Sequence, residues 1–404
     1  MALNYNSHPA EVAAKDGPSD IRIDELKKAI PPRCFKSSYI RSSFSLFQDM
    51  ALAILIMRAA FLFVPQIQSV PVRWLAWAFY GWIEGLIFTG LWVLAHECGH
   101  GALFPSKYMN NFFGFVLHSA LMVPYFSWQS THRRHHLYAN NMNFDHNYVP
   151  PRESEYFKTL WSKVQRVEDL AEDVPAQLLG MPTYLLTNIT ASPTSLHRPK
   201  SKRWLGNGHL DPTGSLFRPE EAYLVLCSDL GLVAMAAALY FTGRQIGSGT
   251  TMLLYLQPYF WVNHWFVAIT YLHHTHPDLP KYEPEAWNFV KGATATVDRE
   301  FGPIGRYLFH GIIEFHVVHH LFPHIPFYHR EEATQAIIPV LGDAYHCDKD
   351  RRFLPGLWES FTKCQYVEAD EATSPKDQAL WYKSGPSPPP EYSMTRKGWL
   401  LKIW

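Results

Sequence analysis

The sequence predicts an all-α membrane protein, in which four transmembrane helices form two hairpins and a cytosolic helical cap holds a histidine-rich metal site. Three observations point to this fold class. Long apolar stretches alternate with polar segments. Phe, Trp and Tyr make up 15% of the residues, and such rings favour membrane–water interfaces. Histidines recur in clusters whose spacing places them on one face of a helix.

The composition narrows the classes of function. The chain has 404 residues, and its 36 basic residues balance its 36 acidic ones, so nothing indicates a nucleic-acid partner. The five cysteines follow no repeating spacing, which argues against a disulfide framework and against a thiolate metal site. We therefore expect the chain to lie in a reducing compartment.

Residues 1–45 form a predicted cytosolic N-terminal segment. They begin polar, so we expect no secretory signal peptide. Residues 19–30 place Ile and Leu at helical spacing before Pro31 and Pro32 end the pattern. Such an amphipathic helix lies either on the protein surface or on the membrane, and we favour the membrane.

The first predicted hairpin follows this segment. Residues 50–64, extended by residues 44–47, reach the roughly 20 apolar residues that a bilayer needs, although Arg58 interrupts them. Residues 74–95 form the second stretch and run directly into the first histidine cluster. Glu84 lies inside that stretch, where an ionisable side chain is either a packing contact or part of a substrate path.

Residues 112–126 decide the topology. They are apolar except for His118 but short for a membrane span. If they crossed, the first two histidine clusters would lie on opposite sides of the membrane and could not share a metal site. We therefore predict an interfacial or re-entrant segment that does not cross.

The second predicted hairpin consists of residues 223–241 and 251–272. Before it, residues 140–220 are polar and read as a soluble cap with a helical segment near residues 156–179. Four spans return the chain to the side that it entered. Basic residues gather on the side of the histidine clusters, which the positive-inside rule makes cytosolic.

These spans divide the chain into regions. The membrane region covers residues 46–272, with an interposed cytosolic segment, residues 96–222, that carries the first two histidine clusters. Residues 273–365 form a cytosolic domain with the third cluster. Residues 366–404 are rich in Pro and charge and read as an extended tail.

Three histidine clusters supply the candidate metal ligands. On a helix, HxxxH turns two imidazoles towards one point and HxxHH turns three. Eight nitrogen ligands are too many for one ion, whereas two iron ions that share a bridging water use most of such a set. Imidazole also suits zinc, copper and nickel, so these metals stay open. The eight residues are His96, His100, His132, His135, His136, His316, His319 and His320.

A further group of histidines follows the fourth predicted span. A ninth ligand from this group would complete a four-and-five division between two metals, and we select His274. His273 and His276 are candidates for an outer layer around the ligands. Glu314 precedes His316 by two positions, and it either holds a ligating imidazole through the second ring nitrogen or is solvated.

The ordered motifs HECGH, HRRHH and HVVHH, with four spans placed between and around them, resemble those of the membrane-bound fatty acid desaturases over most of residues 20–345. Two local strings, at residues 293–299 and 325–328, are similar to the microsomal delta-12 (oleate) desaturases of fungi and plants. Glu97 fits that subgroup, because the omega-3 relatives more often have Asp at this position. The resemblance favours delta-12 chemistry.

The resemblance implies a centre of two non-haem iron ions, held by the eight histidines of the motifs HECGH, HRRHH and HVVHH, which we call the box histidines. This centre uses O2 and two electrons to remove two hydrogens from an acyl chain. The expected reaction converts oleoyl to linoleoyl groups on membrane lipid. The same scaffold also serves omega-3 (delta-15) desaturases, hydroxylases and acetylenases. From another class, a zinc membrane hydrolase remains an alternative.

The electron donor and the location follow from the same resemblance. The chain has no dinucleotide fingerprint, no haem-attachment motif and no His-Pro-Gly-Gly signature of a fused cytochrome b5 domain. A separate cytochrome b5 with its NADH reductase is therefore the expected donor. The hydrophobic and basic ending at residues 399–404 is similar to signals that return such enzymes to the endoplasmic reticulum, and an interfacial anchor explains it equally well. We expect a multi-pass protein in that membrane, with a cytosolic active site.

Overall fold

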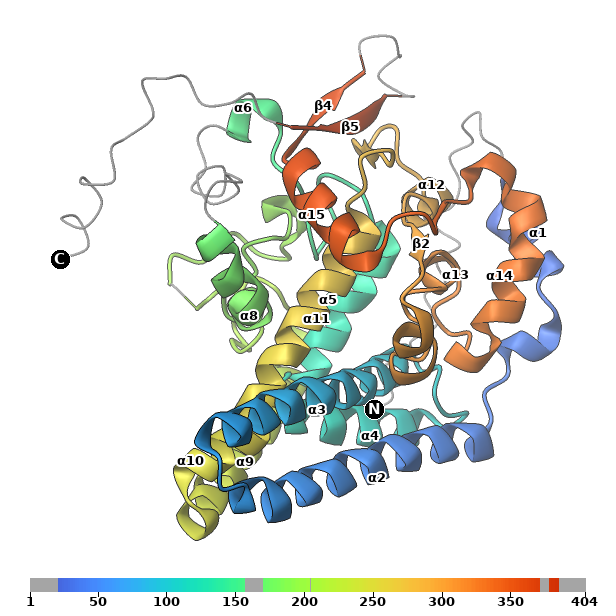
Figure 1. Cartoon of the computed structure of the whole chain (residues 1–404). Coiled ribbons are helices and arrows are strands. Elements are labelled where there is room, and N and C mark those ends of the chain that lie inside the picture. Colours follow the sequence, from blue (N-terminus) through green and yellow to red (C-terminus); the bar gives the residue numbers. More distant parts are fainter. Residues whose placement is uncertain (1–20, 157–169, 204, 371–377, 385–404) are drawn as a thin grey trace.

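The computed structural model describes residues 21–156, 170–203, 205–370 and 378–384. These residues are mostly helical (Figure 1). The longer helices are α2 (Tyr39–Phe63), α3 (Val70–Gly99), α4 (Lys107–Ala120), α5 (Tyr125–Tyr138), α8 (Leu170–Thr187), α9 (Ala222–Ile246), α11 (Gln257–His274), α14 (Phe327–Leu341) and α15 (Phe353–Lys363). The shorter ones are α1 (Ile23–Ala29), α6 (Glu153–Tyr156), α10 (Ser248–Thr251), α12 (Phe289–Thr294) and α13 (His316–Leu321).

Three of the described helical stretches are long and apolar enough to cross a membrane: Tyr39–Gln66, Val70–Gly99 and Pro219–Ile246. They correspond to three of the four predicted spans. Residues 248–274 are helical throughout, through α10, the π-helical turn η6 (Met252–Leu256) and α11, but they are not among the three. The fourth span and the two hairpins therefore stay predictions. α4 has only 14 residues, which agrees with a segment that does not cross.

α3 lies at the centre of these helices. In its most apolar window 78% of the residues are buried, against 22% for α2 and 17% for α9, whose exposed faces are apolar. α3 packs against α2, α4 and α11. Gly85 allows the close approach to α11, because a Cβ there would lie 2.3 Å from the Cβ of Trp261. Glu84 is fully buried in this region, and neither of its oxygens has a hydrogen-bond partner among the described residues.

The N-terminal helix α1 corrects one prediction. We expected the apolar side of residues 19–30 to lie on the membrane. Leu26 and Ile30 are instead buried in one core cluster with Ile337 of α14 and Val317 of α13. The prediction was wrong because an amphipathic pattern shows that one side is covered, but not by what. Residues before 21 lie outside the described part of the chain.

Short strands correct the all-α fold class. Strand β1 (Lys281–Tyr282) pairs antiparallel with β5 (Ala379–Lys383), and β5 pairs antiparallel with β4 (Tyr366–Ala369). Two further strands, β2 (Asp298–Arg299) and β3 (Cys347–Asp348), pair in parallel. Part of the predicted tail thus folds back onto the protein. Such short strands carry little local signal, because their partners are far away in the sequence.

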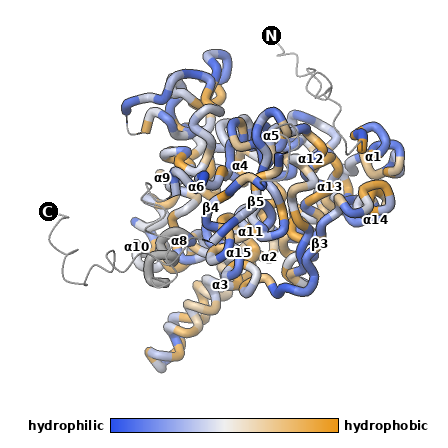
Figure 2. Tube along the Cα trace, turned by 90° about the horizontal axis from the view of Figure 1, so that it is seen from above, coloured by the Kyte–Doolittle hydropathy of each residue, from blue (hydrophilic) through white to orange (hydrophobic). Residues whose placement is uncertain are grey.

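The elements are distributed between two ends of the molecule. In Figure 1 the turn between α2 and α3 and the turn between α9 and α10 lie at one end, and α6, α15, β4 and β5 lie at the other. Figure 2 shows hydrophilic chain around β3 and β4. The helix predicted near residues 156–179 is represented by α6 and α8, and residues 157–169 lie outside the described part. The histidine-bearing ends of α3, α5, α11 and α13 meet between the two ends of the molecule.

Candidate metal centre

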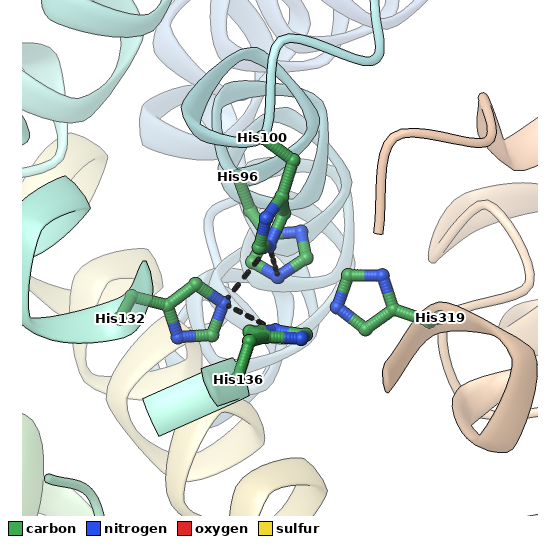
Figure 3. Close-up of side chains that lie close together, drawn as sticks. All are labelled: His96, His100, His132, His136 and His319. Atoms are coloured by element: carbon green, nitrogen blue, oxygen red, sulfur yellow. Dashed lines mark hydrogen bonds between the residues drawn. The ribbon is translucent and has the colours of Figure 1, made fainter. Parts of the chain in front are cut away.

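Five histidines converge where the end of α3 meets α5 and α13 (Figure 3). One ring nitrogen from each lies within 4.8 Å of the others. The closest approaches are the 3.1 Å between the Nε2 atoms of His132 and His100 and the 3.1 Å between those of His136 and His132. We call these residues the five-histidine group: His96, His100, His132, His136 and His319.

A second cluster lies directly beside the first. Ring nitrogens of His135, His274 and His320 lie within 4.8 Å of one another. His316 joins them, because its Nε2 lies 3.2 Å from Nε2 of His274. These residues form the four-histidine group. The ring of His136 stacks on that of His320 at 4.1 Å between centroids, so the two groups are in direct contact.

Helical spacing explains how two helices serve both groups. On α5, His132 and His136 are one turn apart and face the five-histidine group, whereas His135 faces the four-histidine group. On α13, His316 and His320 face the four-histidine group, and His319 faces the other. The structure therefore brings together all nine histidines selected from the sequence, in a five-and-four division.

The donor atoms fit metal ions. Nδ1 of His136 and of His320 and both ring nitrogens of His319 have no hydrogen-bond partner among the described residues. Burial lowers the pKa of His132, His136, His319 and His320 well below the usual range, which keeps these imidazoles neutral. Ring nitrogens that approach one another this closely, at 3.1–3.3 Å, are the arrangement that a cation between them stabilises.

Several imidazoles are oriented through their second nitrogen. Nδ1 of His135 lies 2.7 Å from Oδ1 of Asp145, and Nδ1 of His316 lies 3.3 Å from the carbonyl of Ile312. These contacts leave Nε2 free to face the group. Asp145 was not singled out in the sequence, since a lone acidic residue after HRRHH carries no distinctive spacing.

Of the two predicted outer residues, His273 lies against the four-histidine group, and His276 makes its described contacts elsewhere. His273 lies with Nδ1 2.6 Å from the carbonyl of Val297, and its ring stacks on that of His316 at 4.3 Å. His276 contacts Asp348 and Arg351, away from both groups. Both alternatives for Glu314 were wrong. It is buried and accepts a hydrogen bond from the backbone N–H of Phe301, and no hydrogen bond to a histidine is seen among the described residues.

A buried ion pair lies beside the five-histidine group and contacts one of its members. Arg330 of α14 donates to Oε1 of Glu97 at 2.5 Å, and both side chains are fully buried. The same Oε1 lies 3.3 Å from Nδ1 of His96. Glu97 therefore links α14 to a histidine of the five-histidine group. Nothing in the sequence around Arg330 indicates this role, because the pair joins positions far apart in the chain.

Comparison with known proteins gives the family. The model of the fatty acid desaturase family matches residues 72–348, a segment that contains all nine histidines. The chain belongs to the fatty acid desaturase family. The resemblance inferred from the motifs is thus confirmed.

Relatives of this desaturase cover most of its length. An oleate hydroxylase from Claviceps purpurea is 40% identical over 377 residues, which cover 87% of this chain and 78% of the relative. A delta-12 fatty acid desaturase from Calendula officinalis is 40% identical and spans 89% of this chain and 92% of its own. A delta-12 fatty acid desaturase from Mortierella alpina is 36% identical, with coverages of 86% and 88%.

Proposed function

We propose that this desaturase is a delta-12 acyl-lipid desaturase that converts oleoyl to linoleoyl groups on membrane lipid. The observation that carries the proposal is the convergence of nine histidines into two adjoining groups within a chain of this family. Several relatives named as delta-12 desaturases, from plants and fungi, support the position of the new double bond.

In this proposal the five-histidine group holds one non-haem iron ion and the four-histidine group holds the other. The bound ions supply an oxidising centre that uses O2 and two electrons. An unactivated methylene offers no acidic proton and no leaving group, so acid or base side chains alone cannot start the reaction. The residues of the chain orient the imidazoles and shape the space beside them.

Aromatic rings form one wall of that space. The ring of Trp128 stacks on His132 at 4.3 Å, and the ring of Trp92 stacks on His96 at 5.7 Å. A small apolar cavity lies beside Trp92, between α3 and α11, and Thr89 and Phe266 contribute to its lining. Apolar and aromatic surroundings of this kind exclude water from the space beside the imidazoles.

We further propose that the protein lies in the endoplasmic reticulum membrane with four spans and a cytosolic active site. The three long apolar helices support the membrane part, and the helical run of residues 248–274 supplies the fourth span. Residues 96–222 and 273–365 then form the cytosolic regions around the histidines, between residues 1–45 and the tail from 366. Cytochrome b5 and its NADH reductase supply the electrons in this scheme.

Expression in a yeast that makes oleate but no linoleate tests the proposal. Gas chromatography with mass spectrometry of total fatty acids is expected to show linoleate, with its second double bond at the twelfth carbon. The control is the same chain with His135→Ala, which should accumulate in the membrane without product. Absence of any diene, with the wild-type chain present in the membrane, would contradict the proposal.

Oleate hydroxylation is the second candidate, because one relative at 40% identity is named as an oleate hydroxylase. The same chromatogram separates a hydroxylated acyl chain from linoleate, from an omega-3 product and from an acetylenic one. Metal analysis of the purified protein addresses the remaining class. Two irons per chain agree with a desaturase or hydroxylase, and one zinc would point to a hydrolase.

A further inference from the structure

A chain of buried polar groups leads away from the four-histidine group to a lysine. Its first link is the 2.7 Å contact between Nδ1 of His135 and Oδ1 of Asp145. Asp145 is only 1% exposed, as is the lysine at the far end, Lys281. Polar groups buried this deeply destabilise the fold unless their hydrogen bonds are made. Each polar group along this chain is therefore expected to make hydrogen bonds that identify the next group.

The carboxylate of Asp145 is fixed at both oxygens. Oδ1 also accepts a hydrogen bond from the backbone N–H of Asn147 at 2.9 Å. Oδ2 accepts from the backbone N–H of Asn140 at 2.9 Å. A carboxylate held at both ends cannot rotate, so it presents one oxygen to His135 in one orientation.

Asn140 connects this carboxylate to the lysine. Its side-chain Nδ2 donates to the carbonyls of Gly292 and Ala295 at 2.8 and 2.9 Å, which fixes the amide so that Oδ1 is the free acceptor. Asn140 has a φ of +62°, a left-handed conformation that Asn tolerates better than most residues. The backbone N–H that donates to Asp145 and the side-chain amide that accepts from Lys281 thus belong to the same residue, Asn140, which is buried and has a strained backbone.

Lys281 completes the chain. Its Nζ donates to Oδ1 of Asn140 at 2.5 Å and lies 5.9 and 6.0 Å from the ring centroids of Tyr148 and Tyr382. Tyr382 belongs to β5, which pairs with β1, the strand that carries Lys281. The positive charge of the ammonium is separated from the negative charge of Asp145 by a single residue, Asn140, rather than paired with it directly.

We propose that Lys281 is a positioning residue for the four-histidine group, which acts through Asn140 and Asp145 to hold His135 with its Nε2 towards the bound metal. This inference rests on the proposed metal centre. Loss of a group bonded directly to a ligating imidazole, as Asp145 is to His135, commonly lowers metal affinity about 10- to 100-fold, and the loss of Lys281 should lie at or below the lower end of this range. Lys281 therefore contributes to how tightly the second metal is held, although it touches neither metal nor substrate.

The test uses the full chain purified in detergent and loaded with ferrous iron. The variants are Lys281→Met, which keeps the length but removes the donor, and Lys281→Gln, which keeps a donor without the charge. We expect iron in Lys281→Met to fall from two per chain towards one, and the remaining weakly held iron to pass to a chelator faster, by up to about tenfold. Lys281→Gln should recover part of the loss.

Lys291→Met is the matched control. Like Lys281, Lys291 donates to an uncharged oxygen, here the backbone carbonyl of Ala286, and lies near a tyrosine ring, that of Tyr282, but its ammonium makes no described hydrogen bond to Asn140 or Asp145. This variant should keep two irons with the release rate of the wild type. Equal iron release in both Met variants would overturn the proposal, because the effect would then be a general one on the fold.

Two further outcomes also decide the matter. If Lys281→Met keeps both irons at the wild-type release rate, Lys281 does not position the group. If Lys281→Met fails to accumulate, then Lys281→Gln and Asp145→Asn are compared, and retention of both irons by both of these variants overturns the proposal. Failure of the wild-type chain itself to take up iron would instead refute the proposed function, which keeps the two failures distinct.

Discussion

At the scale of single residues, the histidines of the centre differ in how their ring nitrogens are held. In His135 and His316 one nitrogen is held by Asp145 or a backbone carbonyl, and the other faces the group. In His319 neither nitrogen has a hydrogen-bond partner among the described residues. In the proposed metal centre, the first kind is oriented by the protein alone, whereas the second kind would gain its position from the metal.

Replacing a box histidine by Ala is expected to abolish product formation. His132→Ala removes a member of the five-histidine group and His316→Ala a member of the other, so each should lose iron as well as activity. The chain should still accumulate in the membrane, since the apolar helices are unchanged. Product analysis and iron content in yeast membranes check this. Retained activity in either variant would remove that residue from the ligand set. His274→Ala should behave in the same way.

A histidine outside the centre gives a prediction about pH. His209 is fully buried, with Nε2 3.0 Å from the hydroxyl of Thr131, and burial lowers its pKa from the ordinary 6.5 to about 3. Between pH 3 and 6.5 the unfolded chain binds this proton and the folded chain does not, so stability rises with pH across that window. At pH 5 the histidine costs about 2 kcal/mol relative to neutral pH.

Thermal unfolding in detergent at pH 7.5 and pH 5 measures this effect. The non-titrating His209→Gln keeps a donor and an acceptor, and it should lose less stability on acidification than the wild type does. The slope should shrink without vanishing, because burial also lowers the pKa of His146 to about 2. An unchanged slope in His209→Gln would show that this residue does not set the acid sensitivity.

The sequence was informative about the candidate ligands and silent about the residues that orient them. The eight box histidines stood out because repeated helical spacing is a local pattern, and His274 stood out by the density of histidines around it. Asp145, Asn140 and Arg330 carry no such pattern. Their roles arise from contacts between segments that only the folded chain brings together, and a single sequence holds no record of those pairings.

At the scale of elements, the central position of α3 depends on its small residues. A Cβ at position 85 would meet both Trp261 and the carbonyl of Pro258, at 2.3 and 3.2 Å. Neither group is the flexible end of a side chain, so α3 and α11 must separate to admit a methyl group. Since α3 carries His96 and α11 carries His274, that separation would reach both histidine groups.

Gly85→Ala is therefore expected to lower stability by about 1–3 kcal/mol, the usual cost of overpacking a tight contact. The thermal unfolding midpoint in detergent and the iron content measure the effect. Gly249→Ala in α10 is the matched control, because nothing lies within 4 Å of its Cβ position. If both variants melt at the wild-type temperature, the close contact between α3 and α11 does not limit stability.

Long apolar helices were the most predictable elements and short ones the least. The stretches at residues 50–64, 74–95 and 223–241 all lie within described helices, because their apolar runs leave few other structures open. The strands of the C-terminal sheet were missed, and the covered face of α1 was assigned to the membrane rather than to α14. Both errors concern partners distant in sequence, which local pattern cannot identify.

At the scale of the whole molecule, the proposed topology predicts which cysteine meets the cytosol. Cys347 is exposed in the region proposed as cytosolic, whereas Cys34, Cys98 and Cys364 are buried. Cys227 is also exposed, but it lies in α9, within a proposed membrane span. In sealed microsomes, whose outer face is cytosolic, a membrane-impermeant maleimide should label Cys347 before lysis. Gel shift of the labelled chain checks this, with Cys347→Ser as the control. Labelling of Cys347 only after lysis would invert the topology.

The nine histidines come from four separated segments, the first at His96 and the last at His320. During synthesis the membrane helices leave the ribosome well before the final segment does. A stalled or prematurely ended product can therefore insert into the bilayer while it still lacks His316, His319 and His320. Such a fragment has neither histidine group complete, so the proposed lipid chemistry becomes possible only after synthesis has passed His320.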